Sequence, residues 1–272
     1  MECHKSQVTS HKYRRKIKIF IFLSIFLVFS FFIYTFYLPS KYVVPILMYH
    51  NIDYKNDMLS VTPENFNAQL MFLKKRNYNV ISLNELVNIF VYNKKIPAKA
   101  VVITFDDGKE NNFTNAYRFI KAYRLPATMF VIPGHCGWEG YLTKQELKEM
   151  SQNGIDIASH TLNDVWLPDC SDLQLVEEIY GSKKALEEIT GKKVDFISYP
   201  LGGFNYKVKL AVMKSGYRGG CAVSPGRATA NYDIYAFKRI KVTNKDNRVP
   251  LSFWFKTSGY YMWFKEMKIK KR

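Results

Sequence analysis

Two adjacent carboxylates follow a predicted strand near the middle of the chain. Residues 100–105 are β-branched or apolar, which indicates a buried strand, and they lead directly into Asp106, Asp107 and Gly108. In parallel α/β folds, ligands and catalytic groups gather beyond the carboxyl ends of the strands. The two aspartates are therefore candidates for metal binding and proton transfer. The alternative is that the Asp-Gly pair only closes a turn.

A histidine and a third aspartate follow another predicted strand. Residues 155–159 indicate a strand that ends at His160, and Asp164 lies four positions later. If the chain turns helically here, the two side chains share one face and can reach one ion. Zinc accepts mixed His and Asp ligands, and a site with three protein ligands leaves a position for water, whose pKa the ion lowers. The alternative is a surface turn.

A third strand end presents backbone amides. Residues 194–199 indicate a strand, and Pro200, Leu201 and two glycines follow it. Amides exposed at such a turn can stabilise the negative charge that develops on a carbonyl oxygen. We therefore predict that Tyr199, Pro200 and Leu201 contact the substrate, against the alternative that the turn is only a loop.

The order of these motifs resembles the polysaccharide deacetylases of carbohydrate esterase family 4, which contain the NodB-type domain. The opening Val-Pro-Ile-Leu-Met-Tyr-His, residues 44–50, resembles the branch that includes bacterial poly-N-acetylglucosamine deacetylases, and the similarity spans about residues 43–242. The resemblance implies a distorted (β/α) barrel of about seven parallel strands. It also implies a divalent metal, with zinc expected and cobalt or manganese as alternatives.

The resemblance assigns a role to each candidate residue. Asp106 would be the catalytic base, and Asp107 and His160 would be metal ligands. Asp164 stands where members of the family usually have a second histidine, so the implied metal shell is Asp107, His160 and Asp164. A second carboxylate would weaken the Lewis acidity of the ion and favour harder ions such as manganese.

Other positions also depart from the family pattern. Ser198 stands where many relatives have an arginine, and no histidine follows His160, although much of the family uses a late histidine as general acid. His50, after the first predicted strand, is therefore the candidate for protonating the leaving amine, and a structural histidine is the alternative. His135 is interpreted as a loop residue.

Strands and helices alternate about seven times, which is typical of a parallel sheet, open or closed. Helices are expected to begin at the capping residues Thr62, Ser82, Thr143 and Ser171. There is no internal repeat or low-complexity linker, so we expect one catalytic domain over residues 43–250. The predicted strands span residues 43–49, 100–105, 127–132, 155–159, 194–199, 217–223 and 236–242.

The amino-terminal region predicts a membrane anchor. Residues 1–18 are basic near their end, and residues 19–38 are uncharged, apolar and about long enough to cross a bilayer as a helix. The basic flank should stay in the cytoplasm, which places the catalytic domain outside. A cleaved signal peptide is the alternative, but its apolar region is usually shorter and no small-x-small cleavage site follows here.

The formal net charge of +17 favours anionic partners. Because the lysines are scattered and no zinc-finger or RNP-like pattern occurs, we expect a membrane or cell-wall surface and no nucleic acid. The tail, residues 251–272, mixes aromatic and basic residues, which indicates either contact with anionic lipid or a packed final helix. The three cysteines beyond the anchor do not define a disulfide.

These features predict a single-pass cell-membrane hydrolase that removes N-acetyl groups from a hexosamine polysaccharide of the cell envelope. The polymer would be of the poly-N-acetylglucosamine or peptidoglycan type. One alternative is a relative that binds glycans but has lost the chemistry, which Asp164 and the missing late histidine favour. Another is an O-acetyl esterase on the same scaffold.

Overall fold

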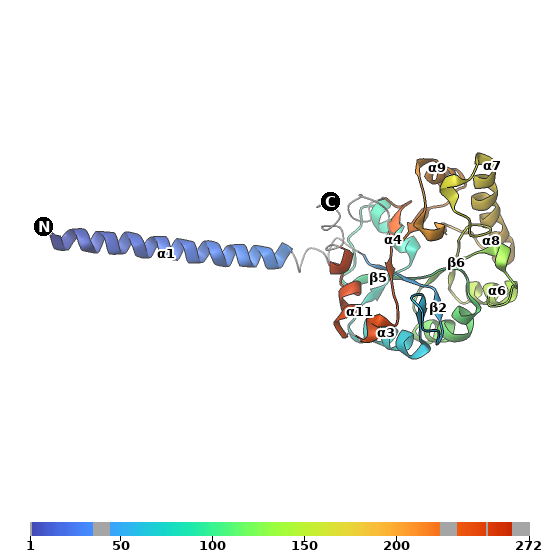
Figure 1. Ribbon diagram of the computed structural model, residues 1–272, viewed down its shortest axis with the longest axis horizontal. Coiled ribbons are helices and arrows are strands. Elements are labelled where there is room, and N and C mark those ends of the chain that lie inside the picture. The colour runs from blue at the N-terminus through green and yellow to red at the C-terminus, as the bar shows by residue number, and fades with distance from the viewer. Residues whose placement is uncertain (1, 35–43, 224–232, 249, 263–272) are drawn as a thin grey trace.

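The computed structural model describes residues 2–34, 44–223, 233–248 and 250–262. Helix α1 (Glu2–Phe32) opens the chain and is followed by an α/β domain (Figure 1). Within the described ranges, no helix is long and apolar enough to cross a membrane. The last residues of the predicted anchor, 35–38, lie outside these ranges, as does the end of the tail, 263–272.

Parallel strands form the centre of the domain. The sheet follows the order β10-β9-β8-β7-β6-β5-β1-β11, and β4 pairs with β5. This path holds eight strands, one more than the seven predicted, because the last predicted strand is divided. The strands are β1 (Ile46–Tyr49), β4 (Asn79–Val80), β5 (Ala100–Phe105), β6 (Thr128–Val131), β7 (Asp156–Ser159), β8 (Phe196–Ser198), β9 (Gly219–Ala222), β10 (Phe237–Lys238) and β11 (Ile240–Lys241), with β2 (Asn51–Ile52) and β3 (Ser60–Val61) in a separate pair.

The division of the last strand nearly closes the barrel. Phe237 in β10 pairs with Cys221 in β9, whereas Ile240 in β11 pairs with Leu47 in β1. Since β9 and β1 lie toward opposite ends of the sheet, the chain crosses from one end to the other at Arg239. The Arg239 side chain is fully buried at this seam.

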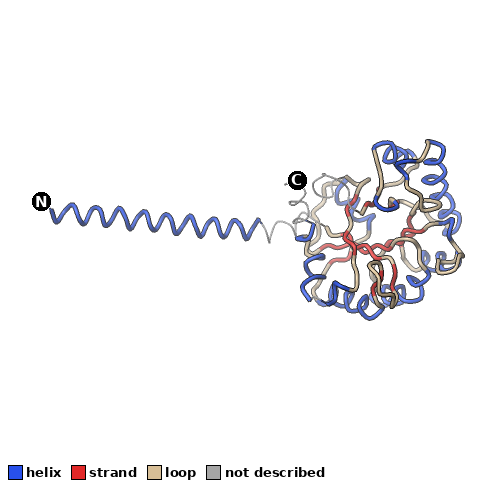
Figure 2. Tube along the Cα trace, viewed as in Figure 1, coloured by secondary structure: helices blue, strands red, loops and turns tan. Residues whose placement is uncertain are grey.

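Helices surround the strands, as Figure 2 shows. Several begin where the capping patterns predict, with Thr62 accepting a hydrogen bond from the Asn65 amide and Thr143 forming a full capping box. The helices are α3 (Pro63–Lys75), α4 (Leu83–Val91), η2 (Asn112–Tyr117), α5 (Arg118–Tyr123), η3 (Pro133–His135), α6 (Lys144–Gln152), η4 (Leu167–Asp169), α7 (Asp172–Leu175), η5 (Val176–Gly181), α8 (Ser182–Thr190), η6 (Pro200–Gly202), α9 (Tyr206–Lys214), α10 (Lys245–Arg248) and α11 (Pro250–Thr257).

The alternation of side chains along β5 determines where the Asp106 side chain lies. Val101, Ile103 and Phe105 belong to the main apolar cluster, together with residues of the surrounding helices. Val102 belongs to a second cluster, formed largely by other strands, and Thr104 is buried. Because successive side chains of a strand point to opposite faces, Asp106 continues the face of Val102 and Thr104. Asp106 is therefore buried, with 2% of its surface exposed.

The described part of the carboxy-terminal region packs on the domain. Phe253 in α11 is buried and meets Phe72 edge-on, with ring centroids 5.6 Å apart. Lys256 pairs with Asp246 at 2.8 Å. Leu251 and Trp254 remain on the surface. The cysteines Cys136, Cys170 and Cys221 are free thiols.

Candidate active site

The carboxyl ends of four parallel strands converge on one site. His50 follows β1, Asp106 and Asp107 follow β5, His160 follows β7, and Tyr199 and Pro200 follow β8. In a parallel barrel, these ends lie at the same face. The predicted groups therefore come together although they are distant in sequence.

The His160 ring is fixed in the tautomer that a metal ligand requires. Its Nδ1 lies 3.0 Å from the carbonyl oxygen of Ser198. A carbonyl oxygen can only accept, so Nδ1 carries the proton and Nε2 of the neutral ring has a free lone pair. This hydrogen bond from the second nitrogen is what metal-binding histidines commonly make.

Two carboxylates face this free nitrogen. Oδ1 of Asp107 lies 3.5 Å from Nε2 of His160, and Oδ1 of Asp164 lies 3.6 Å from it. Donor atoms held at about 2.0–2.2 Å around a tetrahedral zinc ion lie about 3.3–3.6 Å from one another. Each carboxylate oxygen therefore lies at a distance from Nε2 of His160 that fits two donors of one ion.

Across the described ranges, no group of three or more His, Cys, Asp or Glu side chains meets the full arrangement of a metal site. The two distances above bear more directly on metal binding, because they join the candidate donor atoms themselves. In this tautomer, Nε2 and the two carboxylate oxygens all present lone pairs, so none of the three atoms can donate to another. A cation between them would remove this conflict, so the residues present fit a divalent metal.

The backbone of both candidate carboxylate ligands is unusual. Asp107 has φ +71° and Asp164 has φ +60°, and Thr161 between His160 and Asp164 has φ +62°. Residues other than glycine pay of order 1–3 kcal/mol for such conformations, which are concentrated at functional sites. The strain aims Asp107 and Asp164 at His160.

The segment that carries Asp164 is not the helical turn that its spacing suggested. Residues 160–163 form bends and turns, and the Asp164 amide donates to Oγ1 of Thr161 at 3.1 Å. The segment still brings Asp164 to His160, because a network of hydrogen bonds replaces helical geometry.

Glu178 is the centre of that network, and the sequence analysis missed it. Its Oε2 accepts from the amides of Leu162 and Asn163, each at 2.9 Å, and its Oε1 accepts from the Asn163 side chain at 2.8 Å. Glu178 lies in η5 and is buried. An acidic residue on a predicted helix gave no signal of this role, because the contact joins segments fifteen residues apart.

Burial is the largest influence on Asp164 and raises its pKa above the usual range. The charge of Asp107 acts in the same direction, while His160 opposes it. When two carboxyl groups lie beside one another, each disfavours the charged form of the other. A bound cation would favour the charged forms again.

Arg239 holds the candidate base, and it too was missed from the sequence. Its guanidinium donates from Nη1 to Oδ1 of Asp106 at 2.5 Å and from Nη2 to Oδ2 at 2.6 Å. Nη2 also donates to Oγ of Ser198 at 2.6 Å. Ser198 stands where many relatives have an arginine, and here Arg239 reaches this place from the seam of the barrel. Its distance in the sequence concealed this role.

This ion pair sets the charge of Asp106. Burial is the largest influence and acts to raise the pKa of Asp106, but Arg239 and, to a smaller extent, His160 and His50 outweigh it. The net pKa of Asp106 lies below its usual value, so the group is a carboxylate at neutral pH.

His50 is a further member of the site. Burial lowers the pKa of His50, and its electrostatic neighbours are Asp106, Asp107, Arg239 and His160. Nδ1 of His50 is buried, and no described residue offers it a hydrogen bond. A neutral ring with one uncommitted nitrogen is suited to exchanging a proton with a bound substrate.

The structure places the Tyr199 side chain in the core. It is fully buried, its hydroxyl donates to the Tyr235 carbonyl at 2.8 Å, and its ring stacks on Phe204. The Tyr199 side chain therefore supports the core, and contact of this turn with substrate stays a prediction for its backbone. Pro200 is also buried, whereas Leu201 lies on the surface with φ +52° and 85% exposure.

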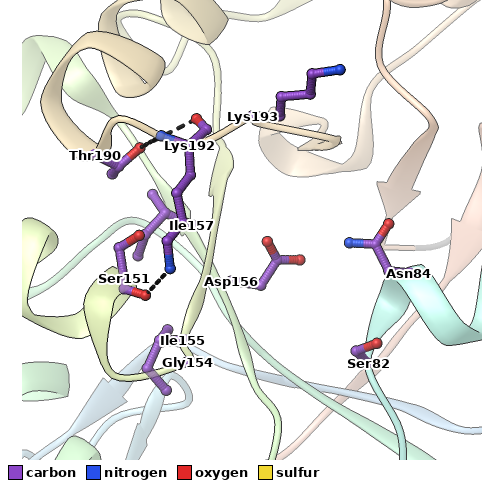
Figure 3. A pocket seen from close by; sticks show the side chains of 10 residues that line it. All are labelled: Ser82, Asn84, Ser151, Gly154, Ile155, Asp156, Ile157, Thr190, Lys192 and Lys193. Atoms are coloured by element: carbon purple, nitrogen blue, oxygen red, sulfur yellow. Dashed lines mark hydrogen bonds between the residues drawn. The ribbon is translucent and has the colours of Figure 1, made fainter.

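A separate cavity of about 230 Å³ lies at the other end of β7, away from His160. Figure 3 shows Asp156 in this cavity. The nearby Lys192 ammonium donates a hydrogen bond to the Ser151 carbonyl and not to Asp156. Oδ2 of Asp156 is buried and has no hydrogen-bond partner among the described residues. Burial, reinforced by the charge of Asp195, raises the pKa of Asp156 to about 7.

The parallel barrel carries its His-Asp site at the carboxyl ends of its strands, where α/β barrel enzymes place their active sites. A model of the family described as polysaccharide deacetylase matches residues 93–220. YxkH of Bacillus subtilis is 36% identical over 205 residues, which cover 75% of this chain and 72% of that protein. The chain belongs to the polysaccharide deacetylase family.

Two further relatives extend the comparison. The poly-beta-1,6-N-acetyl-D-glucosamine N-deacetylase of Staphylococcus aureus is 31% identical over 202 residues, 68% of each protein. The structure of Streptococcus pyogenes deacetylase PplD in complex with acetate matches with a TM-score of 0.73 and 30% identity, covering 80% of this chain and 99% of that one.

Proposed function

We propose that this protein hydrolyses N-acetyl groups on a β-1,6-linked N-acetylglucosamine polymer. The observation that carries the proposal is the convergence of Asp107 and Asp164 on the free nitrogen of His160, beside a buried carboxylate held by Arg239. The similarity to the staphylococcal enzyme supports the choice of polymer.

Asp107, His160 and Asp164 would hold a divalent metal, with zinc as the first expectation and cobalt or manganese as alternatives. When bound, such an ion supplies an activated water and polarises the acetyl carbonyl. The carboxylate-rich shell is compatible with the harder ions.

The remaining steps belong to the side chains and amides of the chain. Asp106, ionised at neutral pH, takes a proton as the water oxygen adds to the carbonyl carbon. The Leu201 amide would donate a hydrogen bond to the oxyanion. The proton that Asp106 took would then pass through the neutral His50 ring to the nitrogen as the carbon–nitrogen bond breaks. Acetate and a free amine are the products.

Acetate release tests this proposal. Purified full-length protein in detergent would be incubated with β-1,6-linked N-acetylglucosamine oligomers and zinc, cobalt or manganese. We expect release with at least one metal, loss with a chelator, and at least about a 100-fold reduction for Asp106→Asn, the size of a typical general-base contribution. No release with any of the three metals, while a related deacetylase works in the same assay, overturns the proposal.

We also propose that residues 19–38, which extend beyond the described part of α1, anchor the enzyme in the cell membrane with the barrel outside. In the described part of α1, apolar side chains from Ile19 to Phe32 are exposed, and basic residues precede them. A surface of this kind is stable in lipid. Carbonate washing of membranes should leave the natural protein behind and release a Phe22→Lys/Leu27→Lys variant. Release of the natural protein would contradict the anchor.

A further inference from the structure

An exposed aromatic cluster lies beside the metal ligands and has no part in the chemistry above. The Trp138 and His135 rings stack with centroids 4.3 Å and planes 23° apart. Tyr141 meets His135 edge-on at 5.0 Å and Trp138 at 6.4 Å. Trp138 nevertheless keeps 59% of its surface exposed. The cluster thus presents one large, flat apolar ring on the surface.

Backbone hydrogen bonds tie this cluster to the segment that follows Asp107. The Leu142 amide donates to the Gly108 carbonyl at 2.9 Å, and the Glu110 amide donates to the Gly140 carbonyl at 3.0 Å. The ammonium group of Lys109 lies 3.7 Å from the centre of the Tyr141 ring. These contacts fix the cluster against the segment that follows Asp107.

A second tie joins the loop to the segment that carries Asp164. The Gly134 amide donates to the Leu162 carbonyl at 2.9 Å. A Cβ atom at position 134 would lie 2.5 Å from Oδ1 of Asn163, so only glycine allows this approach. Trp138 is consequently held in a set position relative to both carboxylate ligands.

We propose that Trp138 is a platform for a second sugar ring of the polymer, next to the residue that loses its acetyl group. This inference rests on the proposed function, because a polymeric substrate must extend from the metal ligands over the neighbouring surface. The C–H face of a pyranose ring is apolar and matches an indole in size, and such stacking requires a ring that is fixed and exposed. Lys109 at the edge of the cluster adds a donor for sugar hydroxyls.

Kinetics with short and long oligomers test the platform in the full-length enzyme. We expect Trp138→Ala to lower kcat/KM for a pentamer about tenfold, which is the size of a well-placed aromatic anchor. The same change should alter hydrolysis of p-nitrophenyl acetate less than about twofold, because this substrate cannot reach the platform. Trp138→Tyr should restore much of the loss. Trp254→Ala, at an exposed tryptophan on α11, is the matched control.

Binding separates this inference from the proposed function. Asp106→Asn should bind the pentamer, and adding Trp138→Ala should raise the dissociation constant for the pentamer about tenfold. If the natural enzyme releases no acetate but binding depends on Trp138, the platform stands and the proposed function fails. If the natural enzyme is active and Trp138→Ala changes neither pentamer binding nor pentamer kcat/KM, the platform is overturned. An equal loss on pentamer and p-nitrophenyl acetate overturns it as well.

Discussion

Arg239 makes two parallel hydrogen bonds to Asp106, at 2.5 and 2.6 Å, and both side chains are almost fully buried. The pair joins the seam of the barrel to the end of its central strand. One contact therefore serves both closure of the fold and the charge of Asp106, the proposed base.

Loss of Arg239 should reduce stability and activity together. Arg239→Met leaves Asp106 as an uncompensated buried charge, and removing one partner of such a pair costs about 3–5 kcal/mol. Urea denaturation of Arg239→Met, Asp106→Asn and the double variant would measure the coupling. We expect the double variant to be more stable than the sum of the single losses predicts, whereas additive losses would contradict a direct pair. Arg239→Lys should not restore activity, since one ammonium cannot bind both oxygens.

Asp164 should control metal affinity and metal choice. We expect Asp164→Ala to weaken metal binding more than about tenfold in calorimetry, because it removes one of three donors. Asp164→His should shift preference from manganese toward zinc without raising activity. A clear rise in acetate release by Asp164→His would instead indicate a decayed site and favour the glycan-binding alternative.

Glu178 should act as a positioning residue for the Asp164 segment. Glu178→Gln keeps one acceptor oxygen but replaces the other, so the amides of Leu162 and Asn163 lose a charged partner. Outer contacts of this kind typically change metal affinity 10–100-fold. Glu177→Gln, at the exposed neighbour, is the control and should leave affinity unchanged. Equal affinities for the two variants would argue against the positioning role.

Asp156 should make the fold less stable as the pH rises. Its folded-state pKa is raised to about 7, so the native state holds a proton that the unfolded chain releases near pH 4. Stability from this group is therefore greatest in acid and falls until the pH passes about 7. The linkage relation gives a loss of about 3 kcal/mol between pH 5 and pH 8.

Urea denaturation of the natural protein and Asp156→Asn at both pH values checks this slope. We expect the variant to be the more stable of the two at pH 8 and to lose less stability between the two conditions. Asp172→Asn, at an exposed position, should leave the slope as it is. An unchanged slope in Asp156→Asn would exclude a buried, protonated Asp156.

The sequence alone determined the features that depend on local chemistry. Residues 100–105 form a strand as predicted, and helices begin at Thr62 and Thr143, because apolar patterning and capping act over a few residues. The resemblance correctly identified the polysaccharide deacetylase family and its parallel barrel. The predicted metal shell remains a prediction, supported by the positions of its three residues.

Only the tertiary structure decided which distant groups support that site. Arg239 reaches Asp106 across 133 residues, Glu178 holds the Asp164 segment from a separate helix, and Tyr199 turns into the core. Each outcome depends on where the ends of the sheet meet and which face of an element is covered. These are properties of barrel closure and packing, which no local pattern of residues encodes.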